Sequence, residues 1–165
     1  RRCETLMSRA FECLPAWKLH NPKFESDAID LWADTRRLRA GVSPQERAKQ
    51  LAAVAYAGDR LIAVTTGAVV HYPPLRQNFA FMRLLVRPEA EKTGVVVPLT
   101  FCFRETLRQW SRENPSAEVA GYAAVITNKG YGTRGVLNAG LTLVDYTPEG
   151  HQVRICWWDH VRLPV

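Results

Sequence analysis

The sequence predicts an α/β fold of the α+β type, in which a central, mixed and mostly antiparallel sheet has helices on both faces. Several segments show the apolar spacing of amphipathic helices, and several others are apolar and rich in Val, Ile, Thr and Tyr. Between residues 79 and 127 a strand, a helix and a second strand follow one another. The chain has 165 residues, of which 47% are hydrophobic, enough for one self-sufficient core. We therefore expect a single domain over residues 1–165.

The N-terminal third is expected to be mainly helical. Residues 1–25 mix apolar side chains with prolines, which indicates a short helix near residues 3–13 and then an irregular arm. A helix is expected over residues 26–40, with Gly41 in the left-handed conformation that ends it. The next helix begins at the capping box Ser-Pro-Gln-Glu and extends over residues 43–51.

Strands follow. Residues 52–57 and 60–70 alternate in hydrophobicity and are separated by Gly58-Asp59, which predicts a β-hairpin. Residues 79–86 are apolar on both faces except for Arg83, as expected for a strand in the centre of the sheet.

The second half of the chain begins with a long amphipathic helix. It is expected to start near residue 96, because Pro98 fits a first helical turn, and to end before Asn114-Pro115. Residues 119–127 form the next apolar strand, and the glycine-rich residues 128–140 form a short helix. The terminal hairpin pairs two strands, residues 141–146 and 153–158.

Charge and composition narrow the classes of function. The net charge is +6, but the basic residues are scattered and form no dense Lys/Arg arm, so nucleic-acid binding is only the least favoured class. No apolar run is long enough for a membrane span, and the N-terminus lacks the pattern of a secretory signal. We expect a soluble, cytoplasmic protein with no membrane partner. The four cysteines form no CxxC pair, so no metal site is expected.

The segment Leu84-Leu85-Val86-Arg87-Pro88-Glu89-Ala90, followed by Gly94 and the apolar helix, resembles the GNAT superfamily of acyl-CoA-dependent N-acyltransferases. Members have a strand ending in Val-x-Pro and then Gln/Arg-x-x-Gly-x-Gly/Ala. The resemblance covers about residues 26–158. It implies the GNAT fold, acetyl-CoA or another acyl-CoA as co-substrate, and an amine as acceptor.

The resemblance also implies which residues contact the cofactor. Backbone N–H groups of the loop and helix start hold the pyrophosphate, which suits the positive end of a helix dipole, and the strand edge pairs with the pantetheine arm. An asparagine after the second central strand joins them. The residues assigned in this way are Leu84, Leu85, Val86, Lys92, Thr93, Gly94, Val95, Val96 and Asn128.

The chain departs from the family pattern at two positions. Glu91 occupies the position of Gln or Arg, and Val96 occupies the position of Gly or Ala. A carboxylate repels a diphosphate, and a β-branched side chain keeps the backbone further from it. Lys92 and Arg87 could offset the charge in part.

Catalytic residues are less clearly marked. Many members carry a general base on or near the central strand, whose only ionisable residue here is Arg83. Tyr131, in the glycine-rich segment, is the candidate general acid, although a tyrosine in such a loop is more often a packing residue. His71, at a strand end, is the candidate base, with a solvated surface histidine as the alternative.

Two main hypotheses follow, with a third of lower weight. The first is an enzyme that transfers an acyl group from a CoA thioester to an amine, for which a homodimer is kept open. The second is a GNAT-fold binding or assembly module without catalysis, which Glu91, Val96 and the lack of a base on the strand favour. The third is a basic nucleic-acid-binding domain.

Overall fold

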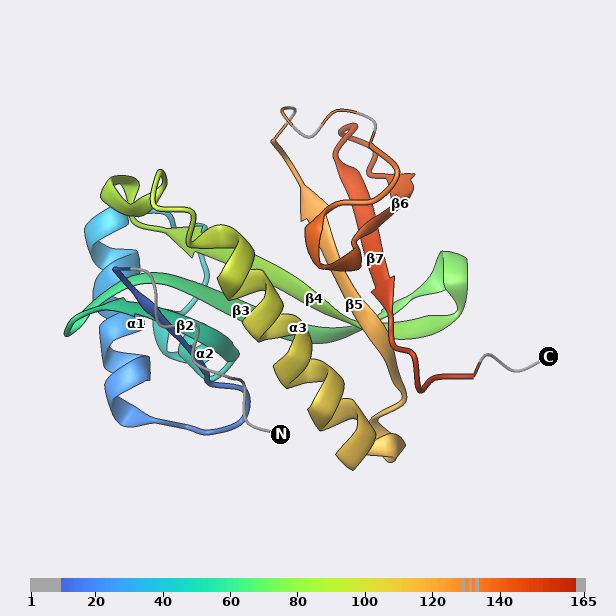
Figure 1. Cartoon of the computed structure of the whole chain (residues 1–165), viewed down its shortest axis with the longest axis horizontal. Coiled ribbons are helices and arrows are strands. Elements are labelled where there is room, and N and C mark those ends of the chain that lie inside the picture. Colours follow the sequence, from blue (N-terminus) through green and yellow to red (C-terminus); the bar gives the residue numbers. More distant parts are fainter. Residues whose placement is uncertain (1–9, 129, 131, 133, 163–165) are drawn as a thin grey trace. The chain divides into compact units, whose positions relative to one another are not determined.

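The protein is described by a computed structural model, which covers residues 10–128, 130, 132 and 134–162 (Figure 1). A seven-stranded sheet has the order β1-β2-β3-β4-β5-β7-β6. Its strands are β1 (Glu12–Pro15), β2 (Leu51–Ala57), β3 (Arg60–Tyr72), β4 (Gln77–Val86), β5 (Val119–Ile126), β6 (Thr142–Tyr146) and β7 (Gln152–Trp157). The α-helices of the described chain are α1 (Pro22–Thr35), α2 (Pro44–Ala48) and α3 (Val96–Glu113).

The pairing of the strands confirms a mixed, mostly antiparallel sheet. β4 and β5 are parallel, with Asn78 opposite Val119 and Met82 opposite Ala124, as a strand-helix-strand connection through α3 requires. β1–β2, β2–β3, β5–β7 and β6–β7 are antiparallel. The chain divides into two compact units, Arg1–Gly67 with Arg83–Thr106 and Ala68–Met82 with Leu107–Val165. Each unit is described by itself.

In the first unit, α1 begins and ends earlier than predicted. Asn21 caps its N-terminus, because its side-chain oxygen accepts from the backbone N–H groups of Lys23 and Phe24 at 3.0 and 3.2 Å. Pro22, which we expected in an irregular arm, occupies the first turn, where its missing N–H costs nothing. Arg36, and not Gly41, ends the helix in the left-handed conformation, with its N–H bonded to the Trp32 carbonyl.

The expectation for residues 1–25 is wrong in its described part. Residues 1–9 lie outside the described structure, and Glu12–Pro15 form strand β1 where the end of a helix was expected. β1 pairs with β2, with Cys13 opposite Ala55. The prolines that suggested an arm therefore flank an edge strand and start a helix, two positions where proline is tolerated.

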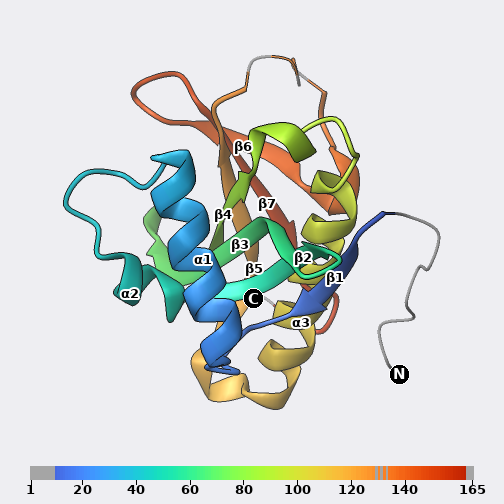
Figure 2. The same ribbon diagram turned by 90° about the vertical axis from the view of Figure 1, so that its left-hand side faces the viewer.

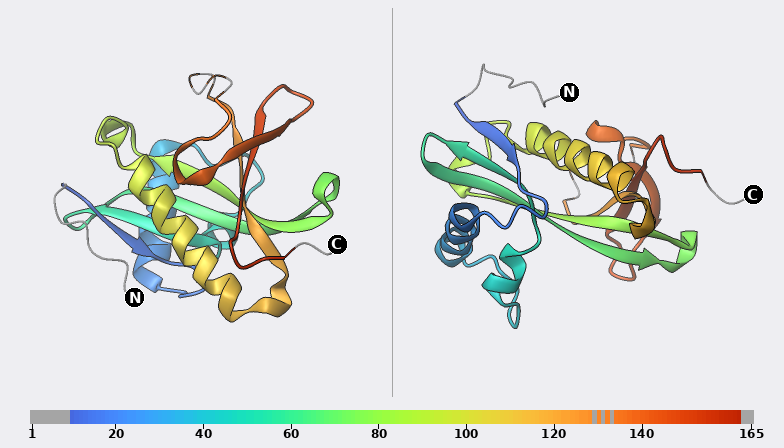
Figure 3. Two further views of the ribbon diagram at one scale, coloured as in Figure 1. Left: turned by 45° about the vertical axis from the view of Figure 1, so that its right-hand side comes forward. Right: turned by 90° about the horizontal axis from the view of Figure 1, so that it is seen from below.

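Helices lie on both faces of the sheet in the first unit (Figures 2 and 3). On one face the buried side chains of α1, among them Leu31 and Trp32, pack with Val54 and Val64 of the strands. On the other face lies the first part of α3, whose Phe103 is fully buried. The contact is close at Gly67 of β3, where an added Cβ would lie 3.2 Å from ring atoms of both Phe103 and Trp17. The predicted N-cap of α2 is confirmed, since the Ser43 hydroxyl accepts from the Glu46 N–H at 3.3 Å, while the Glu46 carboxylate pairs with Lys49 at 2.7 Å.

The second unit is built on β5 and β7. Phe79 of β4 contacts Trp157 edge to face, and Tyr72 contacts Phe79 and Phe81. Gly121 brings the two strands into close approach, because an added Cβ would lie 2.1 Å from the Cys156 carbonyl oxygen. β6 and β7 form the predicted terminal hairpin.

The prediction of a short helix over residues 128–140 is wrong for the described residues. The described residues of this segment have 3-10 geometry only at Gly130 and over Asn138–Gly140, in which Ala139 has a left-handed φ of 61°. The rest of the described segment is irregular, as four closely spaced glycines favour. Residues 129, 131 and 133 lie outside the described structure.

Candidate functional site

The connection from β4 to α3 is a short, compact loop in the first unit. Val86 ends the strand and is buried, and Pro88–Ala90 form a 3-10 turn. The N–H groups of Ala90 and Thr93 donate to the Arg87 and Ala90 carbonyls, at 2.9 and 3.0 Å. Gly94, at a φ of +76°, then reverses the chain into α3. A side chain at this position would be strained, which explains the glycine.

The loop presents backbone N–H groups at the start of an eighteen-residue helix. Helix geometry leaves the first N–H groups without an intrahelical acceptor, and the dipole makes this end positive. Gly94 and Val97 are exposed, whereas Val95 is fully buried and anchors the turn in the core. Leu99 donates back to the Val95 carbonyl at 3.0 Å. The stretch from Gly94 to Val97 is therefore the part of the loop that can receive an anion.

Glu91 forms an ion pair with an arginine from the segment after α1. Its carboxylate lies 3.2 Å from Nη1 of Arg37, and the two side chains are 52% and 48% exposed. The negative charge that departs from the family pattern is thus partly neutralised by a group that the sequence pattern did not indicate. Lys92 is exposed on the same loop. The Thr93 hydroxyl instead donates to the Ala90 carbonyl at 2.7 Å.

Arg87 does not offset the charge of Glu91, contrary to expectation. Its side chain is 9% exposed, its Nε donates to the Leu61 carbonyl at 2.8 Å, and its Nη1 lies 2.9 Å from the Asp34 carboxylate. Its backbone N–H also donates to the Ile62 carbonyl at 2.8 Å. Arg87 therefore fastens the end of β4 to β3 and α1. The role of the Arg87 side chain is therefore structural.

The end of β4 passes from exposed side chains at Arg83 and Leu84 to more buried ones at Leu85 and Val86. Leu85 packs against the core under α1, Leu84 is 36% exposed, and Val86 is buried. Arg83 is exposed and reaches Gln50 at 3.5 Å. As the sequence already showed, β4 carries no carboxylate. Val96, at the helix start, is half-buried and leaves the neighbouring Gly94 exposed.

The remaining predicted site residues lie elsewhere. Asn128 is exposed, in the second unit, and its side-chain oxygen accepts from the Gly130 N–H at 2.8 Å. His71, in the same unit, is exposed, and its Nδ1 lies 3.0 Å from the Asn78 side-chain oxygen. Tyr131 lies outside the described residues. The structure thus brings together the strand end, the loop and the helix start.

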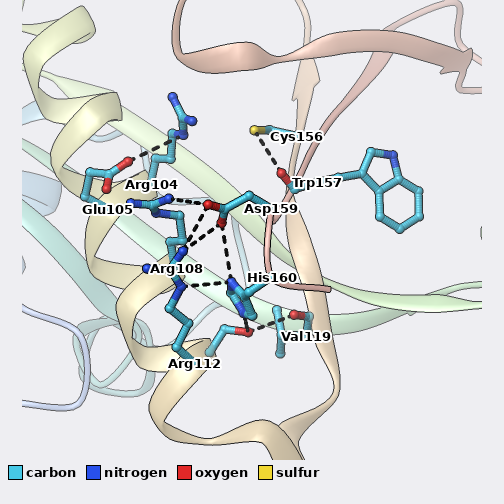
Figure 4. A network of polar contacts seen from close by, with 10 residues as sticks. Arg104, Glu105, Arg108, Arg112, Val119, Cys156, Trp157, Asp159 and His160 are labelled. Carbon is cyan, nitrogen blue, oxygen red and sulfur yellow. Dashed lines mark hydrogen bonds and ion pairs between the residues drawn. The ribbon is translucent and has the colours of Figure 1, made fainter. Parts of the chain in front are cut away.

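A polar network joins α3 to the segment after β7, and Figure 4 labels Asp159 and His160 within it. With Ser111 of α3 it contains the residue types of a hydrolase triad. The buried Ser111 hydroxyl donates to the Val119 carbonyl at 2.9 Å, and its oxygen lies 3.2 Å from Nε2 of His160. Nδ1 of His160 accepts from Nε of Arg112 at 3.3 Å. The hydroxyl proton of Ser111 is thus directed at the Val119 carbonyl and not at His160. This geometry is that of a buried structural serine and does not match a nucleophile activated by histidine.

The aspartate of this network has a structural role. Asp159 pairs with Arg108 at 3.1 Å and with Arg112 at 3.0 Å, which fastens the segment after β7 to the second half of α3. Desolvation raises the pKa of Asp159, but the two guanidinium groups outweigh it and hold this pKa below its ordinary value. Arginines at every fourth position of α3 were the only signal of this contact in the sequence.

Two tyrosine–aspartate pairs were also missed. Tyr56 donates to Asp27 at 2.6 Å in the first unit, and Tyr72 donates to Asp145 at 2.8 Å in the second. Burial and the neighbouring carboxylate raise the pKa of both hydroxyls, that of Tyr72 to about 12. Each hydroxyl proton is thus committed to a carboxylate. Among the described residues no group of His, Cys, Asp and Glu could hold a metal ion, and no described helix is long and apolar enough to cross a membrane.

Comparison with known proteins supports the fold. No family model and no curated protein sequence matches the chain. The putative acetyltransferase yncA of Salmonella typhimurium, solved with its cofactor acetyl-CoA, has a TM-score of 0.63 at 11% identity and covers 95% of this chain and 99% of its own. A bacterial toxin has a TM-score of 0.58 at 14% identity, covering 90% and 92%. A GNAT-family acetyltransferase of Streptococcus pneumoniae has a TM-score of 0.50 at 10% identity, covering 88% and 96%.

These likenesses, taken with the strand order and the β4–α3 loop, show that the chain has the GNAT fold. The prediction from Leu84–Ala90 and Gly94 is confirmed at the level of the fold. At such low identity the solved structures speak for the architecture alone, since one fold hosts many functions.

Proposed function

We propose that the protein is an acyl-CoA-dependent N-acyltransferase, with acetyl-CoA or another acyl-CoA as co-substrate and an amine as acceptor. One observation carries the proposal: a GNAT fold in which the β4–α3 loop keeps Gly94 in a left-handed turn, at the exposed start of a long helix. An anion is favoured at such a terminus. The structure similar to this chain that contains acetyl-CoA has the same fold.

In the first unit, the β4–α3 loop and the start of α3 would hold the cofactor. In this proposal the N–H groups from Gly94 to Val97 bind the diphosphate, Lys92 and Thr93 lie beside it, and the edge of Leu84–Val86 pairs with the pantetheine arm. For Asn128 we keep the cofactor contact that the resemblance implies. Glu91 is the adverse group, and its ion pair with Arg37 reduces the repulsion that the diphosphate would meet.

The reaction would be a direct transfer. The lone pair of a neutral amine attacks the thioester carbonyl, the carbon–sulfur bond breaks, and the thiolate leaves with a proton. A backbone N–H of β4 would polarise the carbonyl. We propose Tyr131 as the proton donor to the thiolate and His71 as the candidate acceptor of the amine proton. Because β4 carries no carboxylate, acceptors that are already neutral at the working pH are favoured.

The test is ligand-dependent stability followed by turnover. Acetyl-CoA at 100 times its dissociation constant should stabilise the fold by about 2.7 kcal/mol and raise the melting temperature. Turnover is then measured as free thiol released from acetyl-CoA with a panel of primary amines. An unchanged melting curve with acetyl-CoA and with longer acyl-CoAs would refute the proposal.

A binding or assembly module without catalysis is the second candidate, and the absence of a carboxylate from β4 favours it. Such a module releases no thiol from acetyl-CoA with any amine, whether or not CoA stabilises its fold. The third candidate, a nucleic-acid-binding domain, predicts strongly salt-dependent retention on heparin, which the scattered basic residues do not favour.

A further inference from the structure

Arg47 of α2 and Arg83 of β4 bring two positive charges together in the first unit, and we call them the arginine pair. Arg83 is exposed, and its Nη1 lies 3.5 Å from the side-chain oxygen of Gln50. The backbone N–H of Gln50 in turn donates to the Arg47 carbonyl at 3.0 Å. Burial lowers the pKa of Arg47, and the nearby charge of Arg83 lowers it further, so the two guanidinium groups act on each other.

No carboxylate of the described chain lies within ion-pair distance of either member of the pair. Other arginines of the first unit do have such a partner: Arg37 pairs with Glu91 at 3.2 Å, and Arg87 pairs with Asp34 at 2.9 Å. Two neighbouring cations without a counter-ion repel each other, and an anion bound between them relieves the repulsion. The arginine pair is therefore suited to an anionic ligand.

Arg83 points to the face of the sheet that carries α1 and α2. Side chains two residues apart on a strand share a face, and Leu85 packs in the core under α1. The contact of Arg83 with Gln50, which follows α2 closely, agrees with this direction. Because Arg83 is exposed and Arg47 is only half-buried, both guanidinium groups remain accessible to a ligand on this face.

The arginine pair adjoins the place where the acyl group would be transferred. In the proposed function the diphosphate lies at Gly94, and the pantetheine arm runs back along Leu84–Val86. Arg83 is the next residue of β4 in that direction, so the thioester at the end of the arm would lie beside it. An amine that attacks the thioester from the α1–α2 face would then be within reach of both guanidinium groups.

We propose that the arginine pair selects the acceptor: an amine that also carries an anionic group, a carboxylate or a phosphate, which Arg47 and Arg83 bind. This inference rests on the proposed function. Guanidinium groups bind the oxygens of both kinds of anion through paired N–H donors. The same two charges repel acceptors with several ammonium groups, and they favour the neutral form of the attacking amine. The positive charge on β4 therefore suits such an acceptor and opposes a polycationic one.

The experiment measures thiol release from acetyl-CoA with two matched pairs of amines. Leucine and leucinamide differ in the carboxylate, and O-phosphoethanolamine and ethanolamine differ in the phosphate. The amine of leucinamide loses its proton more readily, because no carboxylate adjoins it, so a preference for leucine cannot come from a larger supply of neutral amine. The two pairs of amines distinguish a carboxylate site from a phosphate site.

Four variants are compared with the wild type. Arg83→Gln and Arg47→Gln each remove one charge, and Arg83→Lys keeps the charge without the planar donors. Arg39→Gln is the matched control, because Arg39 is exposed and carries the same charge. Since Arg83 is exposed, its variants cover the case in which Arg47→Gln does not fold. Calorimetry with acetyl-CoA reports whether the cofactor site of each variant is intact.

In the wild type, kcat/KM should be about tenfold or more higher for the anionic amine of at least one pair. Arg83→Gln should raise the KM for this amine about tenfold, Arg83→Lys should raise it less, and acetyl-CoA affinity should stay within about twofold of wild type. A wild type that prefers neither anionic amine overturns the inference and leaves the proposed function standing. So does a preference that Arg83→Gln retains, or one that Arg39→Gln loses equally. If no amine releases thiol, the proposed function fails, and the selection of the acceptor fails with it.

Discussion

The negative charge on Glu91 should lower the affinity for acyl-CoA, and its ion pair with Arg37 should reduce this effect. The Arg37–Glu91 contact is 3.2 Å and both side chains are about half exposed, so the pair is worth at most about 1 kcal/mol. Glu91→Gln should therefore strengthen acetyl-CoA binding up to about fivefold, and Arg37→Gln should weaken it by a similar factor. In the Glu91→Gln background, the loss of Arg37 should have little effect.

A double-mutant cycle measured by calorimetry at low salt checks this reasoning. Arg39→Gln is the matched control, since Arg39 is exposed, carries the same charge and lies on the same segment. The four affinities should give a coupling energy of about 1 kcal/mol or less, which falls as salt is added. Equal losses on removing Arg37 in both backgrounds would refute the argument, because Arg37 would then act on the ligand independently of Glu91.

Three further predictions concern stability. Gly121→Ala should destabilise the fold by about 1–3 kcal/mol or more, measured by thermal unfolding, because no side chain fits between β5 and β7. Arg87→Gln should cost about 1–3 kcal/mol in urea unfolding, because it removes a buried hydrogen-bonding group that fastens β4. The difference in unfolding free energy between wild type and Tyr72→Phe should persist up to pH 10 and shrink between pH 10 and 12. The pKa of the Tyr72 hydroxyl is raised in the fold to about 12, so the neutral hydroxyl is the stabilising form.

Each of these has a control or a contrary outcome. Gly135→Ala, where an added Cβ meets nothing within 4 Å, should be close to neutral. Arg60→Gln removes only an exposed pair with Glu89 and should change stability by less than about 1 kcal/mol. A Tyr72→Phe difference that grows above pH 10 would contradict the sign of the argument. If Gly135→Ala lowered the free energy of unfolding as much as Gly121→Ala, the close approach of β5 and β7 at Gly121 would not explain the loss.

The sequence was most informative where local chemistry decides the structure. The N-cap at Ser43, the turn at Gly58-Asp59 and the start of α3 at Val96 were all predicted to within a few residues. The prediction failed in the N-terminal segment. The first helix was expected to begin at residue 26, whereas Asn21 caps α1, and β1 is a strand because β2 offers it a partner. A strand that depends on such pairing has no periodic signature of its own.

What the sequence by itself determined was the order of the strands from β2 onward and the strand-loop-helix unit of β4 and α3, whose motif resembles the GNAT superfamily. These follow from spacing and capping along the chain. The tertiary structure alone decided which charged groups meet: Arg87 with Asp34, Arg37 with Glu91, and Arg154 with the carbonyls of residues 134, 135 and 141. Such partners are distant in sequence, and a charged side chain carries no local pattern that names its counterpart.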